Sequence, residues 1–545
     1  MTAFALATAA LAALRTARAA LLYISLWQVR EYRWDRFRAF LGTRAARALA
    51  LHPLPIARLA LLATLVAIAR WAQPGEAALA AVAALYALEV GLGAREAVAR
   101  TIRRPARTLR ALALTAAVVF AGWAAIGGAV AAAMTADLDD HVRWFSLALA
   151  FLAIDRLLPF AAGALVLAAR LPNQALVALD VQRARRAMRG SRAVVVGITG
   201  SYGKTSTKTF LATILSQRRR VWATPGSVNT LVGVARLIAR SGADYDVMIV
   251  EMGAYREGEI RAICELVRPR IGVLTAVAEQ HLALFGSIER TLEAKFELIE
   301  ALPPDGLAVL NGNDARIRAR SEGVAVPRRF YSATGPADVW AKDVAVGRDA
   351  LEFTVVYGQE EARFRCGVLG RQNVEPLLAA TSVALELGMT LAEVRDAASA
   401  VKPVRRTMEP GQLPGGATCI DDTFSASRAA ILAALDFLAE APAERRFIVI
   451  SGVPELAELT RPVHEEIGVR MSQVCDRMIA VNGDYAPFYE RAMDEAARNG
   501  RFFFEPDPAK AAALLADLCA GDIVLFEGRG AERVLDRLRG RAEGK

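Results

Sequence analysis

Lysine, histidine and cysteine are all scarce in this 545-residue chain. Only seven of its 67 basic residues are lysines, so arginine serves wherever plain positive charge suffices. The four histidines and five cysteines show no metal-ligand spacing, which argues against a zinc site or a disulfide scaffold. The net charge is +10, and the basic residues cluster beside apolar segments. This distribution indicates membrane topology rather than nucleic-acid binding. A lysine inside a motif therefore stands out, because its compact ammonium can lose its proton and a guanidinium cannot.

Charge is also nearly absent from long stretches before residue 190. Four of these stretches have the length and polarity of a membrane span, at residues 52–71, 76–94, 111–134 and 144–169. A fifth apolar segment, 3–29, is interrupted by Arg15 and Arg18, and either spans the bilayer or lies in its interface. The sequence therefore predicts an α-helical membrane bundle of four or five spans over residues 1–190.

The arginines between these segments predict the orientation of the bundle. They crowd into residues 30–47 and 95–110, whereas the loops at 73–75 and 135–141 carry none. The positive-inside rule places the arginine-rich loops, and everything after Arg170, in the cytoplasm. Glu89 and Asp155 lie within spans, so each either pairs with Arg156 or another helix, or has a function. The absence of a basic region before the first apolar segment argues against a signal peptide.

After Arg192 the sequence changes to short apolar runs that alternate with helical patterns, as in doubly wound α/β domains. The first block is expected to have strands at 194–198, 245–251, 271–277 and 307–310, helices at 204–216 and 373–387, and an antiparallel excursion at 339–357. A second α/β block is expected to have strands at 418–420, 447–450, 478–481 and 523–526. A boundary at 402–406 predicts a central domain at 191–403 and a C-terminal domain at 404–545.

A glycine-rich turn joins the first strand of the central domain to the helix after it. The turn fits the pattern TGxxGKT, and its residues are Thr199, Gly200, Ser201, Tyr202, Gly203, Lys204 and Thr205, with Ser206 following. A strand, a glycine turn and a helix start aim backbone N–H groups at a phosphate, unless the turn is a chance one. Lys204 would then reach the β/γ-phosphates of a nucleotide, and Thr205 would hold Mg²⁺.

Three further residues carry chemistry in the same block. Glu251 ends an apolar strand, where a carboxylate faces the crevice of a parallel sheet and suits Mg²⁺. His281 follows the next strand, as either a structural histidine or a metal ligand. Lys295 lies on a helical segment, and its side chain is either solvated or carbamylated by CO₂ to give a metal-binding anion.

The second block contributes one further candidate. Asp422 belongs to an acid pair, Asp421-Asp422, at the end of a strand, and it could contact a nucleotide from the C-terminal domain.

Taken together, these motifs resemble the Mur ligase family of ATP-dependent amide-forming enzymes. The resemblance covers roughly residues 193–538 and rests on motifs in order: 199–205, 224–229, 250–254, His281 with 285–287 and 294–295, 311–314, 370–374, 421–427, 455–456, 464–468 and 521–522. The family's N-terminal UDP-sugar domain is absent, and the predicted membrane bundle takes its place. The stretch after Asp422 also departs from the family at Ser425, Ser427 and Arg428, as does the element Glu527-Gly528-Arg529.

The resemblance implies a role for each site residue. Lys204, His281 and Lys295 would be catalytic. Two Mg²⁺ ions would be held by Thr205, Glu251, His281 and carbamylated Lys295. ATP would be bound by residues 199–201 and 203–206, Asn373, Arg406 (or its neighbour Arg405) and Asp422. The substrate would be contacted by Asn229 and Thr230.

The implied reaction phosphorylates a carboxylate and then forms an amide in peptidoglycan or cell-envelope precursor synthesis. The predicted spans and their arginine-rich loops add that this ligase would be a multi-pass protein of the bacterial inner membrane with cytoplasmic catalytic domains. Its partners would be a small-molecule or lipid-linked precursor and an amino acid or dipeptide, with no nucleic acid. Three alternatives stay open: a polymer-forming ligase such as a poly-γ-glutamate synthase, an ATP-driven transporter (although no LSGGQ-like signature appears), and a non-catalytic membrane scaffold.

Overall fold

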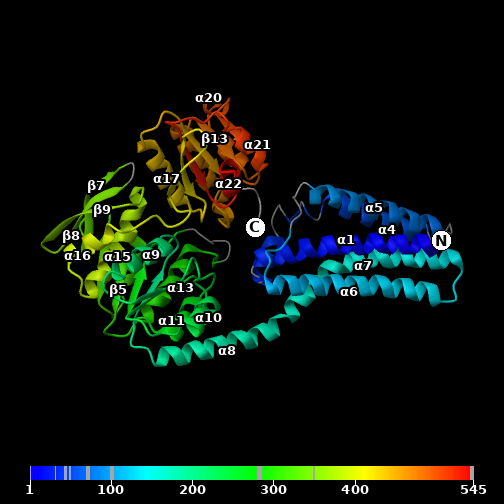
Figure 1. Ribbon diagram of the computed structural model, residues 1–545, viewed down its shortest axis with the longest axis horizontal. Coiled ribbons are helices and arrows are strands. Elements are labelled where there is room, and N and C mark those ends of the chain that lie inside the picture. Colours follow the sequence, from blue (N-terminus) through cyan, green and yellow to red (C-terminus); the bar gives the residue numbers. More distant parts are fainter. Residues whose placement is uncertain are drawn as a thin grey trace. The chain divides into compact units, whose positions relative to one another are not determined.

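The computed structural model describes residues 2–30, 32, 34–41, 46–47, 49, 51–68, 74–98, 104–278, 285–347 and 350–540 (Figure 1). The chain forms two compact units, residues 1–176 and 177–545. The division falls within α8 (Arg170–Arg189), the helix that follows the last apolar span. The first unit is helical and the second is α/β, as the sequence predicts.

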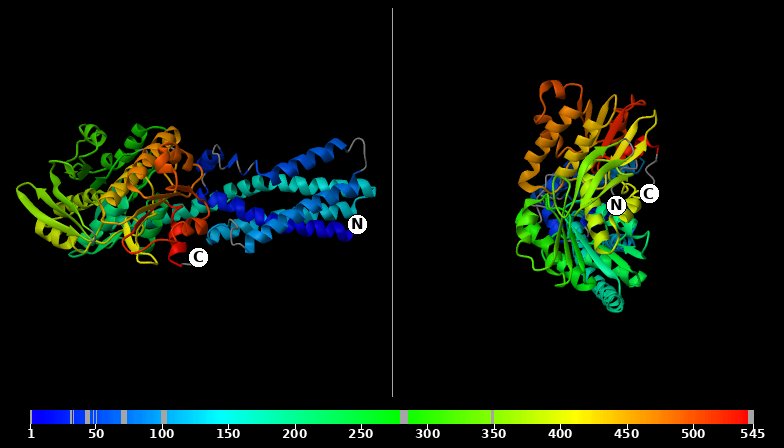
Figure 2. Two further views of the ribbon diagram at one scale, coloured as in Figure 1. Left: turned by 90° about the horizontal axis from the view of Figure 1, so that it is seen from above. Right: turned by 90° about the vertical axis from the view of Figure 1, so that its left-hand side faces the viewer.

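The first unit is a bundle of apolar helices. Its helices are α1 (Thr2–Val29), α2 (Trp34–Leu41), α4 (Pro53–Ile68), α5 (Gly75–Val98), α6 (Leu109–Thr135) and α7 (Asp140–Ala168). Four of them, α1, α5, α6 and α7, are long and apolar enough to cross a membrane. They lie side by side, with α1 against α5 and α6, and α7 against α5 and α6 (Figures 1 and 2).

The structure describes one of the uncertain apolar segments fully and another in part. The segment at 3–29, which carries two arginines, forms a continuous 28-residue helix, α1, that is long and apolar enough to cross a membrane. The segment at 52–71 contributes α4, which is described over the 16 residues Pro53–Ile68. Residues 69–71 of that predicted span lie outside the described residues.

Four buried charges explain why arginine is tolerated in α1. Arg15 Nε lies 2.7 Å from Glu89 Oε2, and Arg15 also pairs with Asp155. Arg58 of α4 completes the cluster, with its Nη1 2.9 Å from Asp155 Oδ2 and its Nε 3.4 Å from Glu89 Oε1. Arg156, the expected partner on α7 itself, lies farther away, with its Nη2 3.8 Å from Asp155 Oδ2. Three arginines therefore surround the two acids, and four helices contribute the cluster. This pairing within the bundle was one of the two expectations for the intramembrane acids.

The central domain is built on a nine-stranded sheet in the order β2-β3-β1-β4-β5-β6-β7-β8-β9. Its strands are β1 (Val194–Thr199), β2 (Val221–Ala223), β3 (Val247–Glu251), β4 (Ile271–Leu274), β5 (Leu307–Asn311), β6 (Arg328–Ser332), β7 (Val339–Val346), β8 (Leu351–Tyr357) and β9 (Glu360–Cys366). Pairing is parallel from β2 through β7, and antiparallel from β7 to β9. All four predicted strands are confirmed, whereas β2, β6 and β9 were not predicted.

Helices cover both faces of this sheet (Figure 1). One face packs against α9 (Lys204–Leu215), α15 (Val374–Glu386) and α16 (Leu391–Ala398). The other packs against α10 (Leu231–Ser241), α11 (Glu259–Val267) and α13 (Ile288–Glu300). A short helix, α14 (Ala315–Ser321), follows β5, and a 3₁₀ turn, η1 (Arg371–Asn373), precedes α15. In a sheet whose two faces are both covered, ligands bind outside the carboxyl ends of the parallel strands.

The C-terminal domain has a six-stranded sheet in the order β10-β11-β15-β12-β13-β14. Its strands are β10 (Glu409–Gln412), β11 (Thr418–Asp422), β12 (Arg446–Ile450), β13 (Arg477–Ala480), β14 (Phe502–Phe504) and β15 (Ile523–Glu527). The helical elements are α17 (Arg428–Glu440), η2 (Ala457–Leu459), α18 (Thr460–Val474), α19 (Ala486–Arg491), α20 (Glu495–Arg498), α21 (Pro508–Ala513) and α22 (Glu532–Leu538). The four predicted strands are again confirmed, and only β10 pairs antiparallel. The five cysteines of the chain are free thiols.

Candidate active site

The glycine turn between β1 and α9 requires both of its glycines. Gly200 has a φ of +148° and Gly203 a φ of +78°, values that residues other than glycine rarely adopt. A Cβ on Gly200 would lie 2.0 Å from Thr275 Oγ1 and 2.9 Å from the Ala276 nitrogen. Thr275 lies just past the end of β4, and its hydroxyl donates to the Tyr202 carbonyl at 2.5 Å. The turn is therefore pressed against the neighbouring strand, and α9 begins at Lys204 with its N–H groups at the crevice.

Lys204 is held over this turn. Its Nζ donates to the carbonyl oxygens of Gly200 at 2.6 Å and Ser201 at 3.1 Å. Burial lowers the pKa of Lys204, and the nearby Glu251 carboxylate opposes this shift. Thr199 and Ser201 serve the framework: the Thr199 hydroxyl donates to the Met252 carbonyl, and Ser201 Oγ accepts from the Ala278 nitrogen.

Glu251, at the end of β3, is the centre of a dense hydrogen-bond cluster. Its Oε2 accepts from Thr205 Oγ1 at 3.0 Å and from Lys208 Nζ at 2.8 Å, and its Oε1 accepts from Asn229 Nδ2 at 3.1 Å. The carboxylate is 1% exposed. A hydroxyl and a carboxylate are the hard oxygen donors that Mg²⁺ prefers, so Thr205 and Glu251 fit the expected ion.

Lys208 is a site residue that the motif analysis did not single out. It lies one helical turn after Lys204 on α9, is 3% exposed, and also donates to the Gly226 carbonyl. The signal was present in the sequence, because Lys208 is the second of only seven lysines and sits four residues after the first. That spacing places both ammonium groups on one face of the helix.

The two predicted substrate residues occupy the start of α10. The Asn229 side chain packs on Gly253, where a Cβ would come within 2.8 Å of its amide carbon. Its amide is directed at Glu251, as described above. Thr230 caps α10, with its hydroxyl accepting from the Gly233 nitrogen at 3.3 Å. Their contact with substrate stays a prediction.

Lys295, on α13, is a buried lysine beside the same crevice. It is 5% exposed, and its Nζ lies 6.0 Å from the centre of the Phe285 ring. Burial, together with the positive charge of Lys204, lowers the pKa of Lys295 from 10.5 to about 7. A substantial fraction of the amine, about half at pH 7, is therefore neutral, as attack on CO₂ requires. His281, the other predicted catalytic residue of this segment, lies outside the described residues.

The remaining nucleotide candidates lie farther along the chain. Asn373 is buried at the start of α15, and its Nδ2 donates to the Leu369 carbonyl at 2.7 Å. Arg406 has φ +61° and pairs with Glu532, 2.7 Å away. Asp422, at the end of β11, lies beside Glu527 at the end of β15, and both are buried. Burial raises the pKa of Asp422 to about 7 and that of Glu527 well above its usual range.

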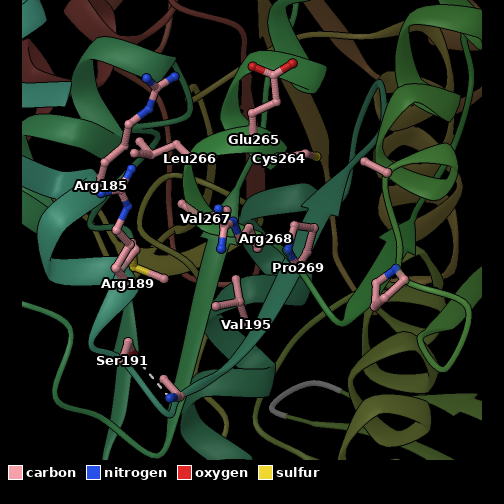
Figure 3. Close-up of a pocket in the computed structure, with 14 residues that line it drawn as sticks. Arg185, Arg189, Ser191, Val195, Cys264, Glu265, Leu266, Val267, Arg268 and Pro269 are labelled. Atoms are coloured by element: carbon pink, nitrogen blue, oxygen red, sulfur yellow. Dashed lines mark hydrogen bonds between the residues drawn. The ribbon is translucent and has the colours of Figure 1, made fainter. Parts of the chain in front are cut away.

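A cavity of about 880 Å³ lies at the opposite end of the central sheet (Figure 3). Its walls include Arg185 and Arg189 of α8, Arg268 after α11, and Val195 near the amino end of β1. The ends of α8, α11 and α13 meet there, so these arginines complement the partial negative charge of helix C-termini. The nucleotide candidates lie at the carboxyl end of the sheet, so we place the chemistry there rather than in this cavity.

Comparison with known proteins agrees with this geometry. Two family models match the chain: the Mur ligase middle domain over residues 198–384, and the Mur ligase glutamate ligase domain over residues 405–530. The UDP-N-acetylmuramoyl-tripeptide–D-alanyl-D-alanine ligase of Mycobacterium tuberculosis is 34% identical over 360 residues, covering 62% of this chain and 70% of the relative. The Escherichia coli ligase of the same name is 31% identical over 290 residues, covering 53% and 64%.

A solved structure shows the same likeness. A MurF ligase from Thermotoga maritima in complex with ADP has a TM-score of 0.61 and 28% identity, and covers 67% of this chain and 83% of its own. These relatives match the chain across both of its α/β domains. The matched region includes the glycine turn with Lys204 and the strand end with Glu251. The chain belongs to the Mur ligase family of ATP-dependent ligases.

Proposed function

We propose that this protein is a membrane-anchored ligase that joins an envelope precursor bearing a carboxylate to an amino acid or dipeptide. The γ-phosphoryl group of ATP passes to a carboxylate oxygen, and ADP leaves. The amine nitrogen then attacks the acyl carbon, inorganic phosphate leaves, and the nitrogen loses a proton to give the amide. The single observation that carries this proposal is the cluster of Lys204, Thr205 and Glu251 at the crevice of a Mur-type central domain.

The ATP half of the reaction assigns roles to the residues of that cluster. Lys204 binds the β/γ-phosphates, and the first-turn N–H groups of α9 face the same charge. Thr205 and Glu251 would hold Mg²⁺, which would neutralise charge on the transferring phosphoryl group. The described residues contain no group of three or more His, Cys, Asp or Glu side chains suited to a metal. Phosphate oxygens and water would therefore complete the coordination of Mg²⁺.

A second ion is proposed beside Lys295. A neutral amine combines with CO₂ to give a carbamate, with loss of a proton, and the new anion suits a divalent cation. The buried position of Lys295 and its lowered pKa support this modification. Three further assignments rest on the family resemblance alone. We propose His281 as a metal ligand and Asn373, Arg406 and Asp422 as nucleotide contacts. We propose Asn229 and Thr230 as substrate contacts.

The acceptor is proposed to be an envelope precursor, either soluble or lipid-linked. The curated relatives are named for a UDP-N-acetylmuramoyl-tripeptide acceptor and a D-alanyl-D-alanine amine. In this chain the residues before the central domain form apolar helices, four of which could span a membrane. A lipid-linked acceptor would explain why the ligase domains are joined to such a bundle.

The topology that we propose has five crossings. Arg58 of α4 contacts Asp155 and Glu89 near the middle of α7 and α5, which supports a crossing by α4 as well. With α1 and α4 both crossing, the arginine-rich segments 30–47 and 95–110 and the ligase domains fall on the cytoplasmic side. Single-cysteine labelling at Arg36 and at Leu138 checks this assignment. Reaction of Arg36→Cys with an impermeant reagent from outside intact cells would contradict it.

Assays in native membranes test the activity. ADP and phosphate should be released only when a carboxylate and an amine are both present, for example UDP-N-acetylmuramoyl-tripeptide with D-alanyl-D-alanine. Lys204→Ala should abolish this release. Mass spectrometry of envelope precursors that accumulate after gene deletion identifies the acceptor. No ATP turnover with any pair, from folded protein, would refute the proposal, and long repetitive products would favour a polymer-forming ligase.

A further inference from the structure

Lys208 is the group in the phosphate-binding region whose role neither the motifs nor the proposed reaction explains. Its side chain is 4% exposed and that of Glu251 is 1% exposed. The two form a buried ion pair, with Lys208 Nζ 2.8 Å from Glu251 Oε2. A buried carboxylate needs a cation or a proton beside it, because desolvation of an unpaired charge costs several kcal/mol. Lys208 meets that need without any bound metal.

The same oxygen of Glu251 is shared with Thr205. Oε2 accepts from the Thr205 hydroxyl at 3.0 Å and from the Lys208 ammonium at 2.8 Å. Thr205 and Glu251 are the pair proposed to hold Mg²⁺. A divalent ion at this oxygen would therefore lie next to a permanent positive charge and be repelled by it. The negative charge of nucleotide phosphates would offset that repulsion.

Lys208 also joins two segments that are far apart in the sequence. Its ammonium donates to the Gly226 carbonyl, in the loop between β2 and α10. Glu251 reaches the same loop through its Oε1, which accepts from Asn229, and through its backbone nitrogen, which donates to Thr224 Oγ1 at 3.1 Å. Lys208 thus fixes both the orientation of the carboxylate and the position of the 224–229 loop.

We infer that Lys208 is a positioning residue that acts as the resident counter-cation of Glu251, orders the 224–229 loop, and makes divalent-metal binding at Glu251 depend on nucleotide. The inference rests on the proposed function insofar as Glu251 is taken as a metal ligand. It adds to that function an order of events, in which metal enters with the nucleotide rather than before it.

Mn²⁺ binding, followed by electron paramagnetic resonance on the purified full-length protein without nucleotide, tests the inference. Lys208→Met should bind Mn²⁺ at least tenfold more tightly than the wild type, because the repelling charge is gone. Lys208→Arg keeps the charge and should stay near the wild-type affinity. Lys342→Met is the matched control, since Lys342 is a partly exposed lysine of β7 that pairs with Glu361, 2.6 Å away, in the same domain. It should change nothing.

Structural damage alone would weaken Mn²⁺ binding, so a gain in affinity is diagnostic. The gain should vanish in Lys208→Met combined with Glu251→Gln, which locates it at this carboxylate. Equal or weaker Mn²⁺ binding by folded Lys208→Met would overturn the inference. If that variant does not fold, Lys208→Gln, which keeps a hydrogen-bond donor without the charge, is measured against the same expectation.

A second readout tests the link to the loop. Hydrogen–deuterium exchange of residues 224–229 should be faster in Lys208→Met than in the wild type, and unchanged in Lys342→Met. Unchanged exchange in Lys208→Met would refute the ordering role. Failure of the proposed function would give a different result. In the presence of ADP or a non-hydrolysable ATP analogue, Glu251→Gln would then leave Mn²⁺ binding the same as in the wild type.

Discussion

Lys295→Ala should abolish ligase turnover, and bicarbonate should restore part of it. The reason is the state of the amine: Lys295 is 5% exposed, and its pKa is lowered from 10.5 to about 7. At about pH 7.5 such an amine is roughly 75% neutral, whereas a lysine at its ordinary pKa is roughly 0.1% neutral. Burial therefore enlarges the pool of amine able to attack CO₂ by several hundredfold.

The assay is amine-dependent ADP release by full-length protein in membranes, in buffer depleted of CO₂ and then supplemented with bicarbonate. Wild-type activity should fall on depletion and recover on addition, with a rising pH limb near pH 7 as the amine deprotonates. Lys295→Ala should lose at least about 100-fold, the scale of a missing electrostatic group in a site of this kind. Bicarbonate restores part of the rate because it can occupy the vacated space as an anion.

Lys342→Ala is the control, because this partly exposed lysine of β7 pairs with Glu361, and β7 lies several strands away from β1 and β3 in the sheet. Isotopically labelled bicarbonate should give a carbamate carbon signal in the wild type that Lys295→Ala lacks. Wild-type activity in Lys295→Ala, or no carbamate signal together with indifference to CO₂, would refute the reasoning.

Three further predictions follow from other contacts. Gly200→Ala forces a Cβ to within 2.0 Å of Thr275 Oγ1 and should destabilise the central domain by about 1–3 kcal/mol in thermal melts, with nucleotide binding lost; normal ADP binding would contradict it. Arg58→Ala leaves Glu89 and its buried partner acid short of a cation, and should lower stability in detergent by about 3–5 kcal/mol; an unchanged melting temperature would show that the cluster is hydrated. Glu527 keeps its proton to a higher pH when folded than unfolded, so its contribution to stability falls as pH rises above the unfolded pKa near 4.5. Glu527→Gln should therefore raise the melting temperature at pH 8 more than at pH 5, and equal shifts at both would exclude the raised pKa.

Much of the architecture could be predicted from pattern alone. Apolar runs of membrane length, and buried strands such as 194–199 and 247–251, are local signals, because the bilayer and the sheet core each demand continuous hydrophobic sequence. Among the central-domain strands that were not predicted, β2 has only three residues, and β6 and β9 carry arginines. Residues 328–332 read as polar because β6 is only partly buried, and its pairing to β5 comes from tertiary packing.

The site divides in the same way. The glycine turn and strand-end Glu251 follow from the sequence, because a phosphate loop needs glycine at fixed positions and parallel strands present their carboxyl ends to one crevice. Sequence spacing could not show that Lys208 shares Oε2 of Glu251 with Thr205, since those contacts join α9, β3 and the 224–229 loop. Nor could it show that Arg15 and Arg58 balance Glu89 and Asp155, because four separate helices supply them. The sequence by itself determined the family and most of the long helices and buried strands, through local periodicity and motif chemistry. Which charges meet, and which lysine lies beside which carboxylate, was decided only when the tertiary structure excluded water and left each buried charge in need of a partner.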